Sequence, residues 1–143
     1  MKRLLYLFLA MNLLACSGSR NENENCKFLL DLNVNLSINL SLPQYSQLQF
    51  DTESVYIPNV GNNGIIVTNA ITNFLAWDAS DPNHSPSNSC RLEISGLEAT
   101  CSCGDGNTYS LINGQPLKSS TLVCGLKNYR VEQSGNTLII SNY

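Results

Sequence analysis

The sequence has few charged residues, and basic residues are the scarcer kind. Charged side chains make up 13% of its 143 residues, and 8 Lys and Arg stand against 11 Asp and Glu, which gives a formal net charge of -3 at pH 7. Proteins that bind nucleic acids need clusters of Lys and Arg to contact phosphates. The sequence contains no such cluster, so its composition argues against a nucleic-acid partner.

Histidine is scarcer still, and the familiar catalytic motifs are missing. His84 is the single histidine, and its polar surroundings at residues 82–87 predict a solvent-exposed loop residue. The sequence has no Gly-x-Ser-x-Gly, no Ser/His/Asp arrangement and no glycine-rich phosphate loop. A nucleophile pair of Cys101 with His84 would require Cys101 to stay reduced. We therefore expect no catalytic residues and no enzymatic activity.

No apolar run reaches the roughly 20 residues that a membrane-spanning helix needs. The longest run stands at the start, where Lys2 and Arg3 precede the apolar residues 4–14 and a small residue leads to Cys16. This order is typical of a secretory signal peptide of the lipoprotein kind. We expect cleavage after residue 15, followed by acyl chains on Cys16 that anchor the protein in a membrane. An ordinary cleaved signal that leaves Cys16 free is the alternative.

The residues after the expected cleavage site read as a spacer before one domain. Residues 17–25 contain no apolar anchor and cannot bury enough surface to order themselves, so residues 16–26 are predicted to be the lipidated cysteine and a tether. Residues 27–143 then form a single domain. A lipid anchor behind a secretory signal predicts a bacterial cell-envelope protein, at the outer membrane, whose further partner is an unknown envelope protein or ligand.

Alternation of apolar and polar residues predicts strands along the whole domain. The clearest case is residues 34–40, whose period of two describes a strand with one buried face. Shorter strand-like runs follow at residues 54–58, 64–69, 73–78, 91–95, 109–112, 121–126, 129–133 and 137–141. Turn residues that tolerate positive φ separate several of these runs, at residues 61–64, 113–114 and 134–136. Many short strands with regular turns predict an all-β sandwich or barrel.

Four short motifs occur in a fixed order between residues 76 and 131. They are Ala-Trp-Asp at 76–78, Asp-Pro-Asn-His at 81–84, Cys-Ser-Cys-Gly at 101–104 and Leu-Lys-Asn-Tyr-Arg-Val at 126–131. With the strand pattern from Phe28 to the carboxyl end, this order resembles a Rieske iron–sulfur domain, in particular small Rieske-like lipoproteins of Bacteroidetes. The resemblance implies a Rieske-like sandwich of small antiparallel sheets.

The resemblance also indicates which residues stand at the ligand positions. A Rieske centre is held by two cysteine thiolates and two histidine imidazoles. Asp81 and Asn83 occupy the cysteine and histidine positions of the first motif. Cys101 matches the cysteine of the second motif, and Gly104 occupies its histidine position, or Asp105 if the alignment shifts by one. One ligand of four remains, so the resemblance implies no cofactor, with a variant 2Fe–2S electron-transfer centre as the alternative.

The remaining cysteines are candidates for disulfides. Six cysteines are present, and an exported protein can oxidise those that lipid does not occupy. In membrane-bound Rieske proteins a disulfide links the two ligand loops, which implies here that Cys90 pairs with Cys103, with Cys101 as the other candidate. A second bridge between Cys26 and Cys124 is a further expectation, although spacing does not determine connectivity.

Two other readings use the same residues. The side chains of Asp81, His84, Cys101 and Cys103 offer donor atoms that zinc accepts. Their spacing matches no common zinc site, so we expect no bound metal. Cys101 and Cys103 would alternatively form a thiol–disulfide pair. The sequence favours a structural or binding module over both.

Overall fold

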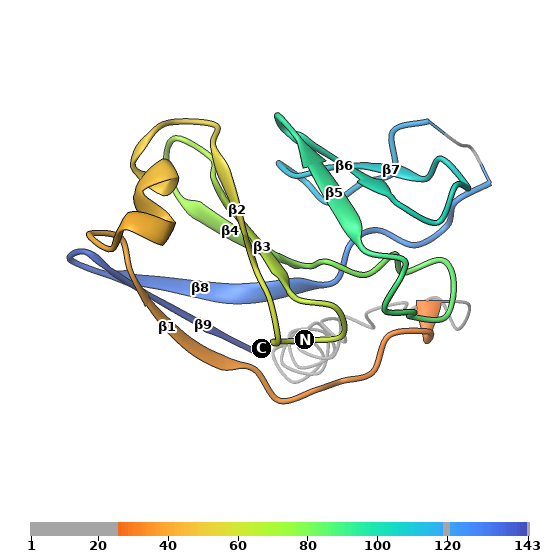
Figure 1. Ribbon diagram of the computed structural model, residues 1–143, viewed down its shortest axis with the longest axis horizontal. Helices are drawn as coiled ribbons and strands as arrows, with labels where there is room; N and C mark the ends of the chain where they lie inside the picture. Colours follow the sequence, from red (N-terminus) through yellow and green to blue (C-terminus); the bar gives the residue numbers. More distant parts are fainter. Residues whose placement is uncertain (1–25, 119–120, 143) are drawn as a thin grey trace, which may run out of the picture.

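The computed structural model in Figure 1 describes residues 26–118 and 121–142. The expected signal peptide at residues 1–15, Cys16 and the tether up to residue 25 lie outside the described residues and stay predictions. The described chain forms a larger and a smaller sheet, which stand side by side in Figure 1. No helix in the described ranges is both long enough and apolar enough to cross a membrane.

Every strand pairing in this part of the chain is antiparallel. The larger sheet has the order β1-β9-β8-β4-β3-β2, and the smaller sheet has the order β5-β6-β7. The strands are β1 (Asn35–Asn39), β2 (Ser54–Ile57), β3 (Ile65–Asn69), β4 (Phe74–Asp78), β5 (Leu92–Ser95), β6 (Glu98–Cys101), β7 (Thr108–Ser110), β8 (Asn128–Ser134) and β9 (Thr137–Ser141). The predicted all-β class is confirmed.

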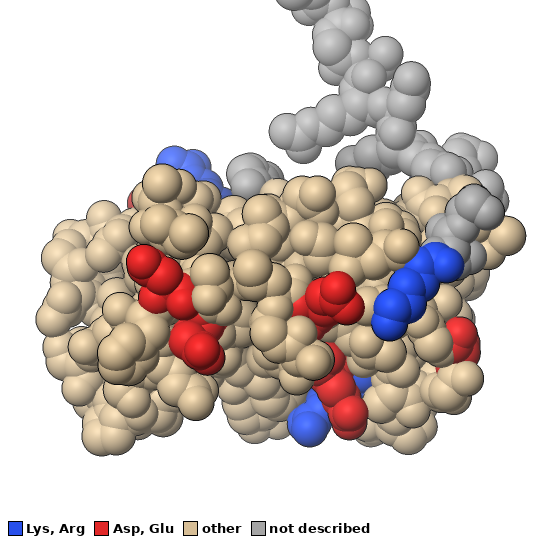
Figure 2. All heavy atoms as spheres, turned by 90° about the horizontal axis from the view of Figure 1, so that it is seen from above, with Lys and Arg blue, Asp and Glu red and all other residues tan. Residues whose placement is uncertain are grey.

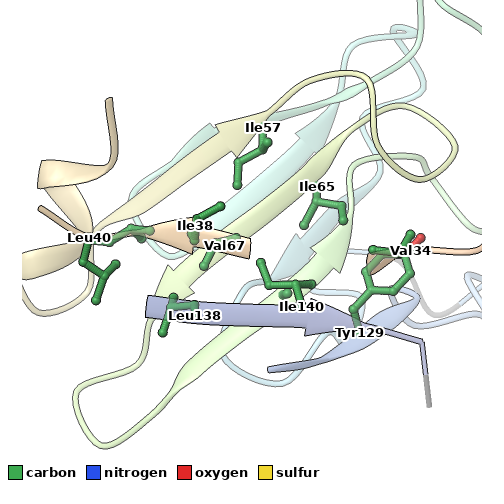
Figure 3. Packing of buried hydrophobic residues seen from close by; sticks show 11 residues of the cluster. Val34, Ile38, Leu40, Ile57, Ile65, Val67, Tyr129, Leu138 and Ile140 are labelled. Atoms are coloured by element: carbon green, nitrogen blue, oxygen red, sulfur yellow. The ribbon is translucent and has the colours of Figure 1, made fainter. Parts of the chain in front are cut away.

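The main core lies on one face of the larger sheet, where side chains from β1, β2, β3, β4, β8 and β9 meet (Figure 3). Alternation in β1 explains how that strand contributes, since Ile38 is 1% exposed while its neighbours Ser37 and Asn39 face the solvent. Burying each large apolar side chain stabilises the fold by about 1.5–3 kcal/mol. The core residues are Val34, Ile38, Leu40, Leu48, Ile57, Ile65, Val67, Ala76, Tyr129, Leu138 and Ile140.

A second apolar cluster joins the larger sheet to the smaller one. All five residues of β3 are buried because both faces of that strand are covered. Ile65 and Val67 point into the main core, whereas Ile66 belongs to the second cluster. Trp77 on β4 packs in the same cluster, and its Nε1 donates a hydrogen bond of 2.8 Å to the carbonyl of Leu111. This cluster supports the loops that carry the candidate site.

Three segments differ from the sequence-based prediction. β6 was not expected, because it buries only Ala99 and Cys101 and therefore lacks a strong apolar pattern. Residues 121–126 were expected to be a strand but form none, because the backbone N–H groups of Cys124 and Leu126 donate to the Asn83 side chain and the Gly114 carbonyl rather than to a ladder. The third segment is the 3-10 helix η2 (Pro43–Gln49), which the sequence did not predict. It follows β1, with proline in its first turn and Leu48 buried in the core.

Candidate functional site

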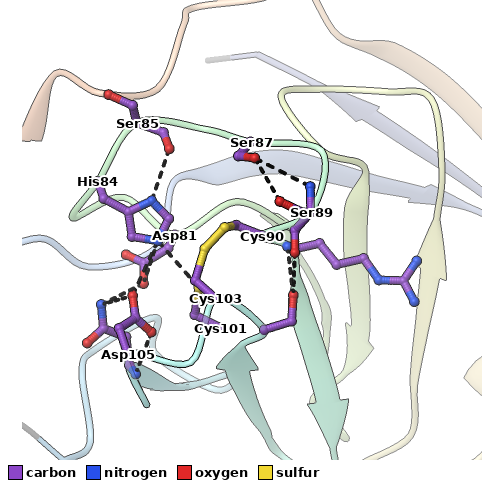
Figure 4. Close-up of a disulfide and its surroundings, with 12 residues drawn as sticks. Asp81, His84, Ser85, Ser87, Ser89, Cys90, Cys101, Cys103 and Asp105 are labelled. Carbon is purple, nitrogen blue, oxygen red and sulfur yellow. Dashed lines mark hydrogen bonds and ion pairs between the residues drawn. A yellow bond between two sulfur atoms is a disulfide. The ribbon is translucent and has the colours of Figure 1, made fainter.

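Three loops meet beside the smaller sheet. The first loop, residues 79–91, joins β4 to β5, and the second loop, residues 102–107, joins β6 to β7. The third loop, residues 121–127, precedes β8. Backbone hydrogen bonds close the first two loops at their bases, from Leu92 N to Ala79 O at 2.7 Å and from Cys101 N to Asn107 O at 2.8 Å. Figure 4 shows the first and second loops around the disulfide that joins them.

Two disulfides fasten this region. Cys90 in the first loop is bonded to Cys103 in the second, with 4.8 Å between their Cα atoms, which is the pair that the family resemblance implied. Cys26 is bonded to Cys124 in the third loop, so the last residue of the expected tether is fixed to the domain. Cys101 is the free cysteine among the described residues. Cys90 therefore pairs with Cys103 rather than with the other candidate, Cys101, and the reading of Cys101 and Cys103 as a thiol–disulfide module stays a prediction.

Asp81 is fully buried in the first loop, and its carboxylate is surrounded by donors. The Tyr109 hydroxyl donates to Oδ1 at 2.6 Å, and the backbone N–H of Asn83 donates to the same oxygen at 2.8 Å. Asn107 Nδ2 donates to Oδ2 at 2.8 Å. Burial, followed by the hydrogen bond to Asp81, raises the pKa of Tyr109, so its hydroxyl stays protonated and remains a donor.

Asn83, which the family resemblance assigns to a histidine position, uses its side chain to tie the first loop to the third. Its Nδ2 donates to the Cys124 carbonyl at 2.9 Å and to the Tyr109 hydroxyl at 2.8 Å. Its Oδ1 accepts the backbone N–H of Cys124 at 3.1 Å. Every hydrogen-bonding atom of this amide group is therefore used to hold loops together.

Gly104, which the family resemblance assigns to the other histidine position unless the alignment shifts to Asp105, offers no side chain. It lies exposed in the second loop with φ +87°, and a Cβ there would have nothing within 4 Å. The four positions thus provide one carboxylate, one amide, one thiol and no imidazole. This set does not fit the two cysteines and two histidines of a Rieske cluster.

Cys101 is 4% exposed, and its environment disfavours the thiolate. Burial is the largest cause, and the carboxylates of Asp105 and Asp81 add to it, so that the pKa of Cys101 is raised to about 11. The backbone N–H of Cys103 opposes this effect. A thiol that stays protonated at neutral pH is a weak nucleophile, so the arrangement does not favour the nucleophile pair with His84.

His84 does not lie in open solvent, and the prediction of an exposed loop residue is wrong. Its side chain is 30% exposed and turns inward toward the second loop. Nε2 lies 3.4 Å from Cys101 Sγ and 3.4 Å from Asp105 Oδ2. The sequence placed His84 with Cys101 only in alternatives that it did not favour, and it missed the contact with Asp105, because only folding brings residues 84 and 105 together.

The donor atoms of Asp81, His84, Cys101 and Asp105 all lie within 4.8 Å of one another. The zinc ligands considered from the sequence alone differ from this group in one residue, because they included Cys103 instead of Asp105. Cys103 lies near His84 and Cys101, but its sulfur is committed to the disulfide. Asp105, whose side chain is 32% exposed, stands in its place.

Charged side chains elsewhere on the described surface are sparse. In the face shown in Figure 2, Lys and Arg do not gather in one place, and acidic groups are scattered among uncharged residues. The absence of a nucleic-acid partner remains a prediction from composition.

Comparison with known proteins bears on the fold. No protein-family model matches the chain, and no curated protein matches it. Among solved structures, the complex of reduced oxygenase and oxidized ferredoxin in carbazole 1,9a-dioxygenase contains a chain with 17% identity and a TM-score of 0.50, over 76% of this protein and 93% of that chain. The ferredoxin of carbazole 1,9a-dioxygenase from Nocardioides aromaticivorans IC177 has 14% identity and a TM-score of 0.48, over 78% of this protein and 98% of that chain. The likeness to the first of these confirms that the protein has a Rieske-like all-β fold.

Proposed function

We propose that this protein is a lipid-anchored protein of the bacterial cell envelope whose Rieske-like domain has lost the 2Fe–2S cluster and serves as a structural or binding module. The observation that carries the proposal is the hydrogen-bond network at the two ligand positions of the first loop. Asp81 and Asn83 use their side chains to hold Tyr109, Asn107 and Cys124.

This network supports the proposal because it links the loops that a bound cluster would otherwise hold together. A cluster ligated from two loops fastens those loops together. Here Asp81 connects the first loop to Asn107 of the second, and Asn83 connects it to the third. The Cys90–Cys103 disulfide closes a short loop and contributes about 3 kcal/mol by the chain-entropy estimate.

Iron and sulfide analysis tests the loss of the cluster. The full-length protein, produced with ample iron and purified in detergent, should be colourless, with no acid-labile sulfide and no paramagnetic signal after reduction. Two irons and two sulfides per chain would contradict the proposal. That outcome would favour the second candidate, an electron carrier like the ferredoxin named among the solved structures, and the colour should then vanish in Cys101→Ser.

The anchoring part of the proposal rests on the motif that ends at Cys16. Acyl chains on that residue would hold the protein at the outer membrane, with two or more chains giving stable attachment. Labelled palmitate should be incorporated into the native protein and absent from Cys16→Ser. Labelling that is equal in both proteins would exclude Cys16 as the lipid site.

A further inference from the structure

Four side chains from the first loop, β6 and the second loop point their donor atoms at one place. Asp81 and His84 come from the first loop, Cys101 ends β6 and Asp105 lies in the second loop. We propose that Asp81, His84, Cys101 and Asp105 bind a single zinc ion. This inference rests on the proposed function, in which the domain holds no 2Fe–2S cluster. The sequence alone favoured no metal, because the spacing of the set considered there, with Cys103 in place of Asp105, matches no common zinc pattern.

The three donor distances from His84 Nε2 fit one tetrahedral ion, and the other donor atoms lie within 4.8 Å of one another. Bonds of 2.0–2.3 Å to nitrogen, oxygen and sulfur place the ligands of a tetrahedral zinc ion about 3.3–3.7 Å apart. His84 Nε2 lies 3.4 Å from Cys101 Sγ, 3.4 Å from Asp105 Oδ2 and 3.7 Å from Asp81 Oδ2. A diiron centre would instead separate its two ligand pairs by the width of the cluster. The observed convergence favours one ion.

The orientation of the His84 ring is that of a metal ligand. Its Nδ1 lies 3.0 Å from the Ser85 carbonyl, which can only accept a hydrogen bond, so this contact favours the tautomer with the proton on Nδ1. In the neutral ring Nε2 is then unprotonated, and its lone pair faces the sulfur and the two carboxylate oxygens. Histidines that bind metals commonly donate their other N–H to a backbone carbonyl in this way.

Asn107 is the positioning residue for both carboxylates. Its Nδ2 donates to Asp81 Oδ2 at 2.8 Å and to Asp105 Oδ2 at 3.1 Å, which are the two oxygens that face His84. Its backbone N–H donates to Asp105 Oδ1 at 3.2 Å. Hydrogen bonds of this kind orient metal-binding carboxylates.

The balance of charge points to a cation as well. Asp81 is fully buried beside a second carboxylate, and among the described residues the only ion-pair partner of either carboxylate is His84, which carries a charge only when Nε2 is protonated. Buried charges in proteins are paired or coordinate metals. Thiolate and imidazole donors select zinc over magnesium or calcium, which prefer oxygen ligands. With four protein ligands the ion would fasten the loops and would leave no open position for catalysis.

Metal binding by the full-length protein in detergent tests the inference. After treatment with a chelator, the protein should bind one Zn²⁺ per chain, measured by competition with a chromophoric chelator. Co²⁺ in the same site should give the visible bands of a tetrahedral ion and a thiolate charge-transfer band. Absence of saturable zinc binding, or an octahedral cobalt spectrum, would overturn the inference.

Variants assign the site to these residues. Cys101→Ser should abolish the charge-transfer band, and Asp105→Asn, on the partly exposed second loop, should weaken zinc binding at least 10-fold without disturbing the core. Asn107→Ala should weaken binding about 10- to 100-fold, because it removes the group that orients both carboxylates. Asp51→Asn is the control. It removes an exposed carboxylate that is not one of the four proposed ligands, so the variant should bind zinc like the native protein. Equal binding in Asp105→Asn and the control would overturn the assignment.

The same samples separate this inference from the proposed function. A protein that holds neither zinc nor iron and sulfide would overturn the zinc site and leave the loss of the cluster intact. Two irons with two sulfides would overturn both.

Discussion

At the residue scale, two tyrosine–aspartate pairs hold buried carboxylates. The hydroxyl of Tyr129 donates to Asp78 at 2.7 Å, and that of Tyr109 donates to Asp81 at 2.6 Å. Burial, followed by the neighbouring carboxylate, raises the pKa of both tyrosines, so both remain donors at physiological pH. Such partners are needed because a buried charge without hydrogen bonds costs several kcal/mol. Asp78 ends β4, and Asp81 follows it in the first loop.

The Tyr109 hydroxyl should be a major support of the candidate site. Tyr109→Phe deprives Asp81 of its shortest hydrogen bond and should lower the free energy of unfolding by about 1.5–3 kcal/mol, measured in urea. Tyr45→Phe is the control, since the Tyr45 hydroxyl makes no hydrogen bond with the described residues, and it should change stability by less than about 0.5 kcal/mol. Equal losses in the two variants would contradict the role of the network.

The thiol of Cys101 should react slowly in protein from which metal has been removed. Its pKa is raised from 9.0 to about 11, so at pH 8 the thiolate fraction is about 100-fold lower than that of an ordinary thiol. Because the raised pKa favours the protonated form, the rate of alkylation should climb as pH rises toward about 11. Mass spectrometry after timed alkylation measures the rate. A rate that levels off below pH 9 would contradict the raised pKa.

At the scale of elements, local pattern predicted most strands and the turns between them. The turn glycines Gly61, Gly114 and Gly135 adopt the positive φ that their sequences predicted. The pattern failed at β6 because that strand buries only Ala99 and Cys101, and it failed at residues 121–126 because their hydrogen-bond partners lie far away in the sequence. β6 is a strand because β5 and β7 flank it, whereas residues 121–126 give backbone hydrogen-bond donors to loops.

Gly114 shows how one turn is coupled to the second apolar cluster. Its φ is +71°, and a Cβ there would lie 2.7 Å from the Trp77 ring. Gly114→Ala should therefore lose about 1–2 kcal/mol to backbone strain and about 1–3 kcal/mol to overpacking, measured by urea unfolding. Gly135→Ala is a matched control, because its φ of +58° gives the same strain while no atom lies within 4 Å. A loss in the control as large as in Gly114→Ala would show that packing against Trp77 adds nothing.

At the scale of the whole molecule, covalent links connect parts that are far apart in the sequence. The Cys26–Cys124 disulfide spans 98 positions, whereas Cys90–Cys103 spans 13. Near the first of these, Lys127 Nζ lies 3.0 Å from Asp31 Oδ1 and lowers the pKa of that carboxyl. The segment ahead of β1 is therefore held against the third loop, beside the candidate site.

The longer disulfide should contribute more to stability. The double variant Cys26→Ser/Cys124→Ser should lose about 4.7 kcal/mol, against about 3 kcal/mol for Cys90→Ser/Cys103→Ser, because closing a longer loop removes more entropy from the unfolded chain. Chemical denaturation of the two double variants under identical conditions makes the comparison. A larger loss in the second variant would indicate that the short bridge acts chiefly on the folded site.

The sequence by itself determined the all-β class, because side-chain alternation and turn glycines are local properties. The order of its short motifs also identified the Rieske-like fold, whereas the assignment of Asp81, Asn83, Cys101 and Gly104 to ligand positions stays a prediction from the resemblance. Only the tertiary structure decided that Asn83 holds the third loop, that His84 faces Cys101, and that Asp105 completes a set of four donors. These contacts join residues 17 to 41 positions apart, and such pairings depend on how the sheets and loops pack rather than on any local pattern.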